Sequence, residues 1–452
     1  MMQTFDPSRD TQKPDTSRFF RCVEELDPVA CYGRVNQVIG LTIESRGPIC
    51  GVGELCQIES RDDKPLLAET VGFLRDSTIL MPLGEMQGVG PGSKVEALGR
   101  TLSVGVSDAL LGRILNGLGM PVDGKGPIRA RDLYPAYRLP PNPLERAPID
   151  KPLSVGVRCL DGCLTCGSGQ RLGIFAGSGV GKSTLLGMIA RNTSADVSVI
   201  ALVGERGREV REFIERDLGE QGLKRSCVIA ATSDQPPLVR IKAALVATAV
   251  AEYFRDQGLN VLLMMDSVTR FAMAQREVGL ATGEPPATRG YTPSVFALLP
   301  KLLERSGVGA KGSITGFYTV LVDGDDFNEP IADAIRGTLD GHIVLSRSLA
   351  EVGHYPAVDV LASVSRVMPS VTTAEHQRKA RLLKAVLATY REAEDLINIG
   401  AYVSGSNPKI DYAISLINQV NAFLRQDVFE KTDLEHAVGS LQQLFSGKEC
   451  PF

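Results

Sequence analysis

The N-terminal part of the chain shows short apolar segments between turn-forming residues. Residues 1–18 are polar, and from Cys22 to Leu98 apolar stretches of strand length alternate with Gly, Pro and Asp. This pattern predicts short strands joined by tight turns, which is typical of a small all-β barrel. We therefore expect a flexible tail over residues 1–18 and a β-barrel domain over residues 19–98.

In the middle of the chain, apolar segments alternate with helical patterns. Between Val155 and Ser370, stretches such as RLGIFA, VSVIALVGE and NVLLMMD are each followed by residues with helical spacing. Strands and helices that alternate in this way form a mostly parallel sheet flanked by helices. The pattern predicts an α/β domain over residues 99–373, which a Gly- and Pro-rich connection (117–128 and 139–152) joins to the barrel.

The last part of the chain has the periodicity of amphipathic helices. The stretch EHQRKARLLKAVLATYREAEDLIN places apolar residues on one helical face, namely Leu383, Val386, Leu387, Tyr390 and Ile397. The later stretch DYAISLINQVNAFL repeats this pattern. We expect a small C-terminal helical domain over residues 374–452, so the whole chain combines a β-barrel, an α/β domain and a helical domain.

Composition and charge narrow the classes of partner. The chain has 49 Lys and Arg and 53 Asp and Glu, which gives a net charge of −4. It has no excess of positive charge to neutralise a phosphate backbone, so we expect no nucleic-acid partner. No stretch approaches the roughly 18 consecutive apolar residues of a membrane span, and the first residues lack the apolar core of a signal peptide. These features predict a cytoplasmic protein.

Two motifs compete in the stretch CLTCGSGQRLGIFAGSGVGKSTLL, which begins at Cys163. The first is the C-x-x-C pair Cys163 and Cys166, a spacing found in metal and redox sites. A zinc site would need a second pair or nearby histidines, but the four histidines lie far away, at 342, 354, 376 and 436. The nine cysteines are odd in number and scattered, which favours free thiols. We interpret the pair as small residues in a tight turn before a strand.

The second motif is a glycine-rich loop between the predicted strand RLGIFA and a helix. It differs from the pattern G-x-x-x-x-G-K-[ST] in having Ala176 at the first glycine, which we assign to the end of the strand. Backbone N–H groups of such a loop and the N-terminus of its helix bind phosphate groups. We expect Lys182 to reach the β and γ phosphates of a nucleotide and Ser183 to hold Mg²⁺. The predicted nucleotide-binding residues are Gly177, Ser178, Gly179, Val180, Gly181, Lys182, Ser183 and Thr184.

Two carboxylates at strand ends are candidates for the chemistry. Asp266 ends the stretch NVLLMMD, and Glu205 ends VSVIALVGE and is followed by Arg206. In a P-loop protein, an acid at the end of a neighbouring strand holds Mg²⁺, and a residue near the γ phosphate orients or deprotonates the attacking water. The pattern alone leaves two alternatives open, namely Asp266 as a turn residue and Glu205 with Arg206 as a surface ion pair.

Six stretches make the sequence resemble the catalytic subunits of rotary ATPases. They are AGSGVGKST, VGERGREVREF, AVAEYFRDQGLNVLLMMDSVTRF, GEPPATRGYTPSVF, DGHIVLSRSLAEVGHYPAVDVLASVSRV and LGRILNGLGMPVDGKGPI, and the resemblance extends from about residue 22 to the C-terminus. Within that superfamily the chain is most similar to flagellar type III export ATPases, through LTCGSGQRLGIFAGSGVGKS, RSCVIAATSDQPPLVRIKAALVATAVAEYFRDQG and GAYVSGSNPKIDYAI. The resemblance implies a central RecA-like P-loop ATPase domain that uses ATP and Mg²⁺.

The resemblance also implies roles for single residues near the phosphates. Glu205 falls on the catalytic glutamate of the family, and Arg206 beside it falls on an arginine near the γ phosphate. Asp266 falls on the magnesium aspartate, and Arg270 corresponds to an arginine behind the catalytic site. For Glu205 and Asp266, the resemblance agrees with the interpretation of the strand ends.

Three further positions match functional residues of the family. Tyr355 matches the aromatic residue that stacks on adenine, and Phe429 is a candidate for a second ring, with a place in the core as the alternative. Arg366 resembles the arginine finger that one subunit of an F-type synthase offers to its neighbour, with a structural arginine between helices as the alternative. Because Glu205 and Arg366 lie on one chain, the resemblance implies a homohexameric ring in which each subunit completes its neighbour's site.

A cellular role and partners also follow from the resemblance. It implies a ring on the cytoplasmic side of the inner membrane, at the membrane proteins of a flagellar export gate, where ATP hydrolysis helps to release export substrates from chaperones. The tail of residues 1–18 would bind a stator-like regulatory protein, and a stalk protein would stand in the pore of the ring. The acidic loop 323–333 would line that pore, with a solvated acidic surface as the alternative.

The sequence was also compared with the features expected for three other functions of a P-loop ATPase fold. The ATPase of a virulence-type injection apparatus shares fold and mechanism, and the loop AGSGVGKS favours the flagellar branch. A Rho-like RNA translocase should show basic residues among exposed aromatics in its barrel, but residues 22–98 contain no basic cluster. A non-catalytic subunit is disfavoured because Lys182, Glu205 and Asp266 are all present.

Overall fold

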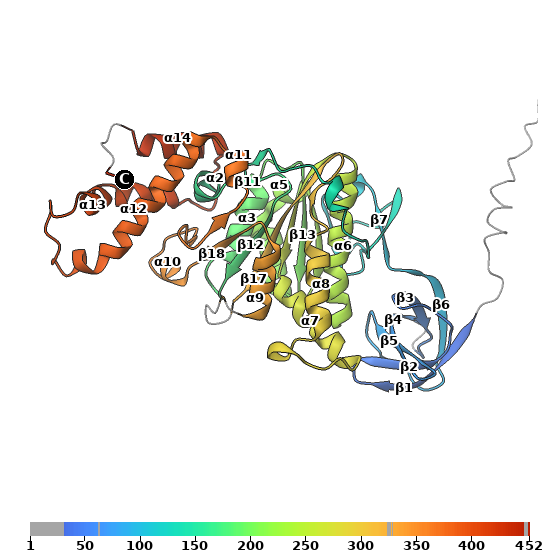
Figure 1. The fold of residues 1–452 in the computed structure, drawn as a ribbon. Helices are drawn as coiled ribbons and strands as arrows, with labels where there is room; N and C mark the ends of the chain where they lie inside the picture. The colour runs from blue at the N-terminus through green and yellow to red at the C-terminus, as the bar shows by residue number, and fades with distance from the viewer. Residues whose placement is uncertain (1–30, 62–63, 323–326, 328, 447–450) are drawn as a thin grey trace, which may run out of the picture.

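The computed structural model describes residues 31–61, 64–322, 327, 329–446 and 451–452. Figure 1 shows a small barrel at one end, a large sheet flanked by helices in the middle, and a helical unit at the other end. This arrangement confirms the predicted fold class. The predicted tail over residues 1–18 lies outside the described part of the chain.

Six antiparallel strands close the barrel in the order β1, β2, β5, β4, β3, β6. They are β1 Tyr32–Ile39, β2 Thr42–Arg46, β3 Glu54–Ile58, β4 Leu66–Leu74, β5 Ser77–Pro82 and β6 Lys94–Thr101. Alternate residues such as Val35, Ile43 and Val95 are buried in a core of the barrel's own. The short apolar stretches of the sequence are therefore the walls of a closed barrel, which leaves no edge strand exposed.

The middle of the molecule is a nine-stranded sheet in the order β19, β18, β12, β17, β15, β13, β14, β8, with β16 paired to β17 outside this path. The strands from β18 to β8 are parallel. The bounds are β8 Arg113–Asn116, β12 Arg171–Ala176, β13 Val197–Val203, β14 Ser226–Ala231, β15 Asn260–Asp266, β16 Gly307–Val308, β17 Ser313–Leu321, β18 Gly341–Leu345 and β19 Val364–Ser365. Every residue of β13 is buried, as expected for a parallel strand that is covered on both faces.

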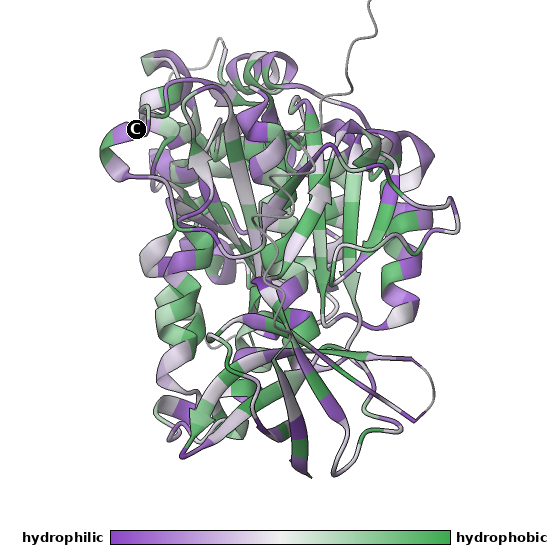
Figure 2. Ribbon diagram, turned by 90° about the vertical axis from the view of Figure 1, so that its right-hand side faces the viewer, coloured by the Kyte–Doolittle hydropathy of each residue, from purple (hydrophilic) through white to green (hydrophobic). Residues whose placement is uncertain are grey.

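Alternate residues of these strands belong to two hydrophobic cores. Val199 and Ala201 of β13 share a core with helices α6, α7 and α8, whereas Ile200 and Leu202 share a core with α3 and the C-terminal helices. Figure 2 shows the strands of this sheet in largely hydrophobic colours.

The helices of this domain have the following bounds: α2 Arg158–Cys163, α3 Lys182–Asn192, α4 Gly207–Glu212, η3 Phe213–Leu218, α5 Gly219–Lys224, α6 Pro237–Asp256, α7 Val268–Ala281, α8 Pro293–Leu303, α9 Pro330–Thr338, α10 Arg347–Glu351 and α11 Met368–Val371.

The connection between the barrel and β12, which includes the Gly- and Pro-rich stretches 117–128 and 139–152, contains regular structure that its composition does not predict. One strand of it, β8, pairs with β14 and becomes the last strand of the central sheet. On either side of β8, β7 (Ser103–Val106) pairs with β9 (Asp132–Pro135). The remaining short elements are η1 Asp108–Leu110, η2 Pro143–Glu145, β10 Pro152–Leu153, β11 Cys166–Gly167 and η4 Thr288–Gly290.

Three helices form most of the C-terminal part, namely α12 Ala374–Asn398, α13 Pro408–Leu424 and α14 Leu434–Leu444. Each begins after a residue whose side chain accepts a hydrogen bond from a backbone N–H of the first turn: Thr373, Asn407 and Asp433. Leu383 and Val386 of the predicted apolar face are fully buried. Within the described residues, no helix combines the length and apolar character needed to cross a membrane.

Candidate functional site

The glycine-rich loop, Glu205 and Asp266 lie at one edge of the central sheet. The loop follows β12, Asp266 is the last residue of β15, and Glu205 comes shortly after β13. Because parallel strands end at the same edge, residues far apart in sequence meet there. Ala176 is the last residue of β12, as predicted, so the departure from the loop pattern falls inside a strand.

Two glycines give the loop a shape that other residues rarely adopt. Gly179 and Gly181 have φ angles of +80° and +90°, in the left-handed region that favours glycine. A Cβ atom at Gly181 would also lie 3.3 Å from the ring of Tyr355. Helix α3 begins at the next residue without a side-chain cap, so its first N–H groups are open to a phosphate.

Lys182 lies between two carboxylates. Its Nζ atom is 2.5 Å from Oδ1 of Asp266 and 3.4 Å from Oε1 of Glu205. The hydroxyl of Thr319 on β17 donates a hydrogen bond of 2.7 Å to the same Asp266 oxygen, which fixes that carboxylate. One positive charge thus faces two negative charges, and a bound cation would balance the surplus.

The two sides of this cluster have shifted pKa values. Burial alone would lower the pKa of Lys182, but the attraction of Asp266 and Glu205 outweighs it and raises that pKa above its ordinary value. Burial raises the pKa of Glu205 to about 7, against the opposing effect of Lys182 and with support from the negative charge of Asp266. A carboxyl group that titrates near neutral pH is suited to accept a proton from water.

The residues present fit a magnesium–nucleotide complex. Ser183 lies exposed in the first turn of α3, next to Lys182, and supplies a hydroxyl oxygen beside the carboxylate cluster. Mg²⁺ commonly takes only one or two protein oxygens and completes its shell with phosphate and water. In agreement with this, the described residues contain no group of three or more His, Cys, Asp and Glu that could hold a metal alone.

The two predicted arginines near the phosphates differ in their surroundings. Arg206 has a side chain that is 77% exposed and lies 3.8 Å from the carboxylate of Glu209. Arg270 lies directly behind the site, because a Cβ atom at Gly204 would be 2.9 Å from the Cβ of Arg270. The structure therefore packs Arg270 against the residue before Glu205, whereas it does not bring Arg206 into the Lys182 cluster.

The two predicted aromatic residues lie beside α3. The Tyr355 ring contacts the start of the helix at Gly181 and is 43% exposed. Phe429 is 70% exposed, which is unlike a core residue, and its ring centroid is 5.2 Å from the guanidinium carbon of Arg191 in the last turn of α3. No stacking contact joins the two rings in the described residues.

Arg366 lies far from the loop of its own chain. Its backbone N–H donates to the carbonyl of Asp340, whose carboxylate accepts hydrogen bonds from Arg171 at the start of β12. The glycine-rich loop follows the other end of that six-residue strand, roughly 20 Å away at about 3.3 Å per residue. The side chain of Arg366 is exposed, and no hydrogen bond or ion pair to it is found within the described chain.

The competing cysteine pair is buried. Cys163 ends α2 and Cys166 begins β11, and both side chains are free thiols with an exposed fraction of 1%. Burial raises the pKa of Cys163 to about 12, and it raises the pKa of Cys166 well above its ordinary value. A thiol that stays protonated and covered is a poor nucleophile and a poor metal ligand.

One residue of the site was not predicted from the sequence, and one predicted loop lies largely outside the described residues. Thr319 was not predicted, although a polar residue near the carboxyl end of an apolar strand, here SITGFYTVL, is a usable signal. The predicted pore loop 323–333 falls largely outside the described residues, which omit 323–326 and 328.

Comparison with known families identifies the class of the fold and site. The ATP synthase alpha/beta family profile for the nucleotide-binding domain matches residues 156–365, and the profile for its beta-barrel domain matches residues 35–99. The profile of the T3SS EscN ATPase C-terminal domain matches residues 372–443. The barrel, the P-loop sheet and the helical unit are thus those of an ATPase built like the ATP synthase α and β subunits.

Similar proteins narrow this class. The flagellum-specific ATP synthase of Bacillus subtilis is 56% identical over 96% of this chain and 100% of that protein. The type 3 secretion system ATPase of Xanthomonas euvesicatoria is 52% identical over 90% of this chain and 92% of that protein. The assembled ATPase EscN of enteropathogenic E. coli superimposes with a TM-score of 0.87 at 47% identity, covering 91% of this chain and 99% of that one. The chain belongs to the family of flagellum-specific ATP synthases and type 3 secretion system ATPases, and it is an ATPase.

Proposed function

We propose that the chain is the ATPase of a flagellar type III export apparatus. The support is its identity of 56% with the flagellum-specific ATP synthases of both Bacillus subtilis and Treponema pallidum, compared with 52% for the Xanthomonas secretion ATPase. In this role it works on the cytoplasmic side of the inner membrane, at the export gate, and helps chaperones release their export substrates. The ATPase of an injection apparatus is the second candidate, because the fold matches EscN closely.

Deletion of the gene that encodes this chain in its source organism distinguishes the two candidate functions. The flagellar role requires that flagellar filaments disappear while other secreted proteins remain. A cell that keeps its filaments but loses a separate set of secreted proteins would support the second candidate. Complementation with the Glu205→Gln variant is the matched control, because it separates the need for ATP turnover from the need for the protein itself.

Within one subunit, the residues divide the work of hydrolysis. The uncapped start of α3 and Lys182 bind the β and γ phosphates, and Ser183 with Asp266 would hold Mg²⁺. When bound, Mg²⁺ neutralises charge on the phosphates. Glu205 orients the attacking water and accepts its proton, for which its pKa of about 7 is suited. Tyr355 and Phe429 cover the base, Arg270 supports Glu205, and Arg206, whose side chain is exposed, turns toward the γ phosphate.

One observation carries the quaternary proposal, namely that Arg366 lies at the opposite edge of the sheet from its own loop. It cannot reach a γ phosphate bound in the same subunit, but its exposed side chain is available to a neighbour. We infer a homohexameric ring in which Arg366 acts as an arginine finger across each boundary. The solved EscN structures are those of the assembled ATPase and of its complex with a central stalk, EscO, so a stalk in the pore of this ring is part of the proposal.

The ring mechanism predicts that activity depends on concentration. A missing finger costs on the order of 10³ to 10⁵ in rate in related phosphoryl-transfer enzymes, so the turnover per subunit should rise steeply as monomers assemble. Arg366→Ala should assemble and bind ATP, yet remain slow at every concentration. Arg366→Lys keeps the charge but loses the planar fork, so it should recover only part of the rate. A turnover per subunit that stays constant from monomer to ring would contradict the proposal.

Residues 1–18 lie outside the described chain, and the regulatory partner proposed for them rests on the family resemblance. Deletion of this segment should leave the barrel folded and ATP hydrolysis intact, but should abolish binding of a stator-like regulatory protein. Unchanged affinity of the truncated protein for that partner would place the docking site elsewhere.

A further inference from the structure

Gln426 follows α13 and links the C-terminal helices to the nucleotide-binding domain. Its side chain is buried, with an exposed fraction of 5%. Its Oε1 accepts a 2.7 Å hydrogen bond from the backbone N–H of Arg158, and its Nε2 donates to the carbonyls of Gly156 and Glu430 at 3.0 Å each. A single buried amide therefore ties residues 156–158 of the nucleotide-binding domain to residues 426–430, which lie about 270 positions later in the sequence.

The backbone of Gln426 holds the residue proposed to contact the base. Its N–H donates a hydrogen bond of 3.0 Å to the carbonyl of Tyr355, whose ring lies against Gly181 at the start of α3. The side-chain hydrogen bonds fix the position of this peptide group. Loss of the side chain would leave the N–H without a firm anchor and would release the Tyr355 carbonyl.

The Gly156 contact leads to the other end of α3. Gly156 has a φ of +68°, and a Cβ atom there would lie only 2.2 Å from the Cβ of Asn192, the last residue of the helix. Gln426 thus binds one segment that touches the start of α3 and another that packs against its end. The helix that carries the phosphate-binding lysine is held between them.

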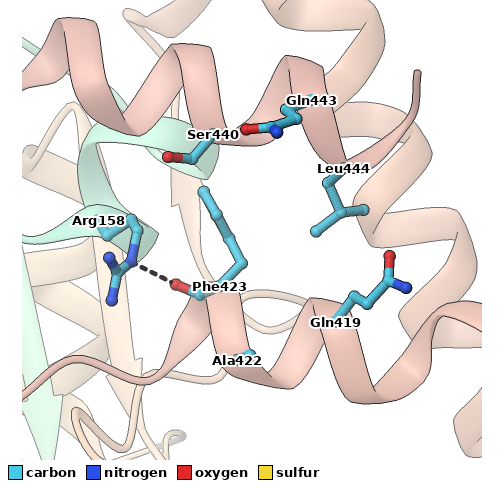
Figure 3. A pocket seen from close by; sticks show the side chains of 7 residues that line it. All are labelled: Arg158, Gln419, Ala422, Phe423, Ser440, Gln443 and Leu444. Carbon is cyan, nitrogen blue, oxygen red and sulfur yellow. Dashed lines mark hydrogen bonds between the residues drawn. The ribbon is translucent and has the colours of Figure 1, made fainter.

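Arg158 strengthens the same junction from the nucleotide-binding domain. Its Nε donates to the carbonyl of Phe423, as Figure 3 shows, and its guanidinium also binds the carbonyl of Arg425 and the carboxylate of Glu430. Arg158 borders a cavity of about 490 Å³ lined by residues of α13 and α14. The end of α13 is therefore fixed to α2 directly before the chain reaches Gln426.

We propose that Gln426 is a positioning residue that sets the place of Tyr355 and so couples the C-terminal helices to the base side of the nucleotide site. This inference rests on the proposed contact between Tyr355 and the base. It implies that a displacement of the C-terminal helices changes the affinity for the base, while the phosphate-binding loop keeps its shape.

Arg191 of α3 also donates a hydrogen bond of 2.6 Å to the carbonyl of Val428, but neither this contact nor the following two involve Tyr355. His376 on α12 is bonded through Nε2 to the carbonyl of Gly162, and Lys384 donates to the carbonyl of Ser363. Neither contact involves α3 or Tyr355. They hold the helical unit in place, whereas the Gln426 contacts also reach the site.

The test compares a nucleotide with the same phosphate chain lacking a base. In the full-length protein, Gln426→Ala should weaken binding of Mg-ADP about ten-fold, which is the scale of one lost base–aromatic contact, and should leave binding of magnesium pyrophosphate nearly unchanged. KM for ATP should rise while kcat at saturation changes little. Gln419→Ala is the matched control, because Gln419 is a glutamine that lies exposed on α13 and borders the cavity beside Arg158 (Figure 3).

Two further variants make every outcome informative. Gln426→Glu keeps the Oε1 acceptor but loses both Nε2 donations, so it should show the same selective loss even if the alanine variant folds poorly. Equal weakening of Mg-ADP and pyrophosphate in both variants would mean a general structural role and would overturn the proposal, as would unchanged ADP binding. If Tyr355→Ala left ADP binding unchanged, the proposed base contact itself would fail, which is a different result from failure at Gln426 alone.

Discussion

Two buried lysines of the chain lie in opposite surroundings. Lys182 stands at the carboxyl edge of the central sheet between Asp266 and Glu205. Lys242 on α6 is fully buried where the barrel meets the sheet, in an ion pair with Glu69 of β4 and 2.9 Å from the hydroxyl of Tyr137. Both are ammonium groups with carboxylate partners, although only Lys182 lies in a sequence motif.

The two lysines differ in the number of carboxylates that face them. Lys242 has one carboxylate partner, and burial lowers its pKa despite the attraction of Glu69, whose own pKa is raised by burial. Lys182 has two carboxylate partners, and their combined attraction raises its pKa. A balanced pair joins two domains, whereas a cluster with surplus negative charge leaves room for a further cation. The comparison indicates that the unbalanced cluster is the functional one.

Among changes at the two lysines and their partners, removal of the surplus carboxylate should have the largest effect on turnover. Glu205→Gln should bind Mg-ATP almost normally but lose turnover by on the order of 10² to 10⁴, because it removes the group that orients water and no phosphate contact. Lys182→Ala should instead weaken ATP binding. Paired measurements of nucleotide affinity and single-turnover rate check both variants, and an equal loss of affinity in the two would exclude this role for Glu205.

Breaking the Lys242–Glu69 pair should lower the stability of the folded protein. Lys242→Met leaves Glu69 buried without a positively charged partner and should lower the free energy of unfolding by about 3 to 5 kcal/mol. The double variant Lys242→Met with Glu69→Leu should recover most of that loss, because it removes both charges. Denaturant unfolding measures the stabilities, and turnover per folded molecule should stay close to that of the unchanged protein. A catalytic defect in the stable double variant would show that this pair also serves the site.

The pH profile should report the unbalanced cluster. The protonated form of Glu205 cannot accept a proton from water, and its pKa is about 7. Below that pH, kcat/KM should therefore fall about ten-fold per unit, and above it the rate should level off. Glu205→Gln should show no such ionisation in its small remaining activity. Persistence of the same midpoint in that variant would assign it to another group.

The smallest effect is expected at the cysteine pair. Cys163→Ser combined with Cys166→Ser should leave ATP turnover nearly unchanged, since both thiols are buried and protonated. Metal analysis of the purified protein should find no bound zinc. Stoichiometric zinc, or a large loss of activity in the double variant, would reopen this pair as a site.

Local pattern was sufficient for the residues that follow strands. Lys182 and Asp266 could be predicted because a glycine-rich loop and a run of apolar residues are both read from adjacent positions. Arg366 could be singled out only by resemblance, since the role proposed for it depends on a second subunit. Gln426 acts through partners about 270 residues away, so no local pattern marks it, and Thr319 is marked only as a polar residue near the end of an apolar strand, without indication of its partner Asp266.

The same limit applies to the fold. The barrel, the alternating strands and the C-terminal helices follow from hydrophobic periodicity, and the structure confirms them. The four-residue strand β8 was missed because it lies directly before the Gly- and Pro-rich stretch 117–128 and is too short to show a period. The Lys242–Glu69 pair was missed because it forms only when the barrel is placed against α6.

Strand β8 also determines where the chain can be divided. It lies in the connection, yet it completes the central sheet beside β14, and the neighbouring β7 packs near α6. A fragment that began after this connection would lose its outermost strand and expose the backbone of β14, which is a template for pairing with other chains. An exchange of barrels between relatives should therefore join the chains before Ser103, so that the connection stays with the sheet that it completes.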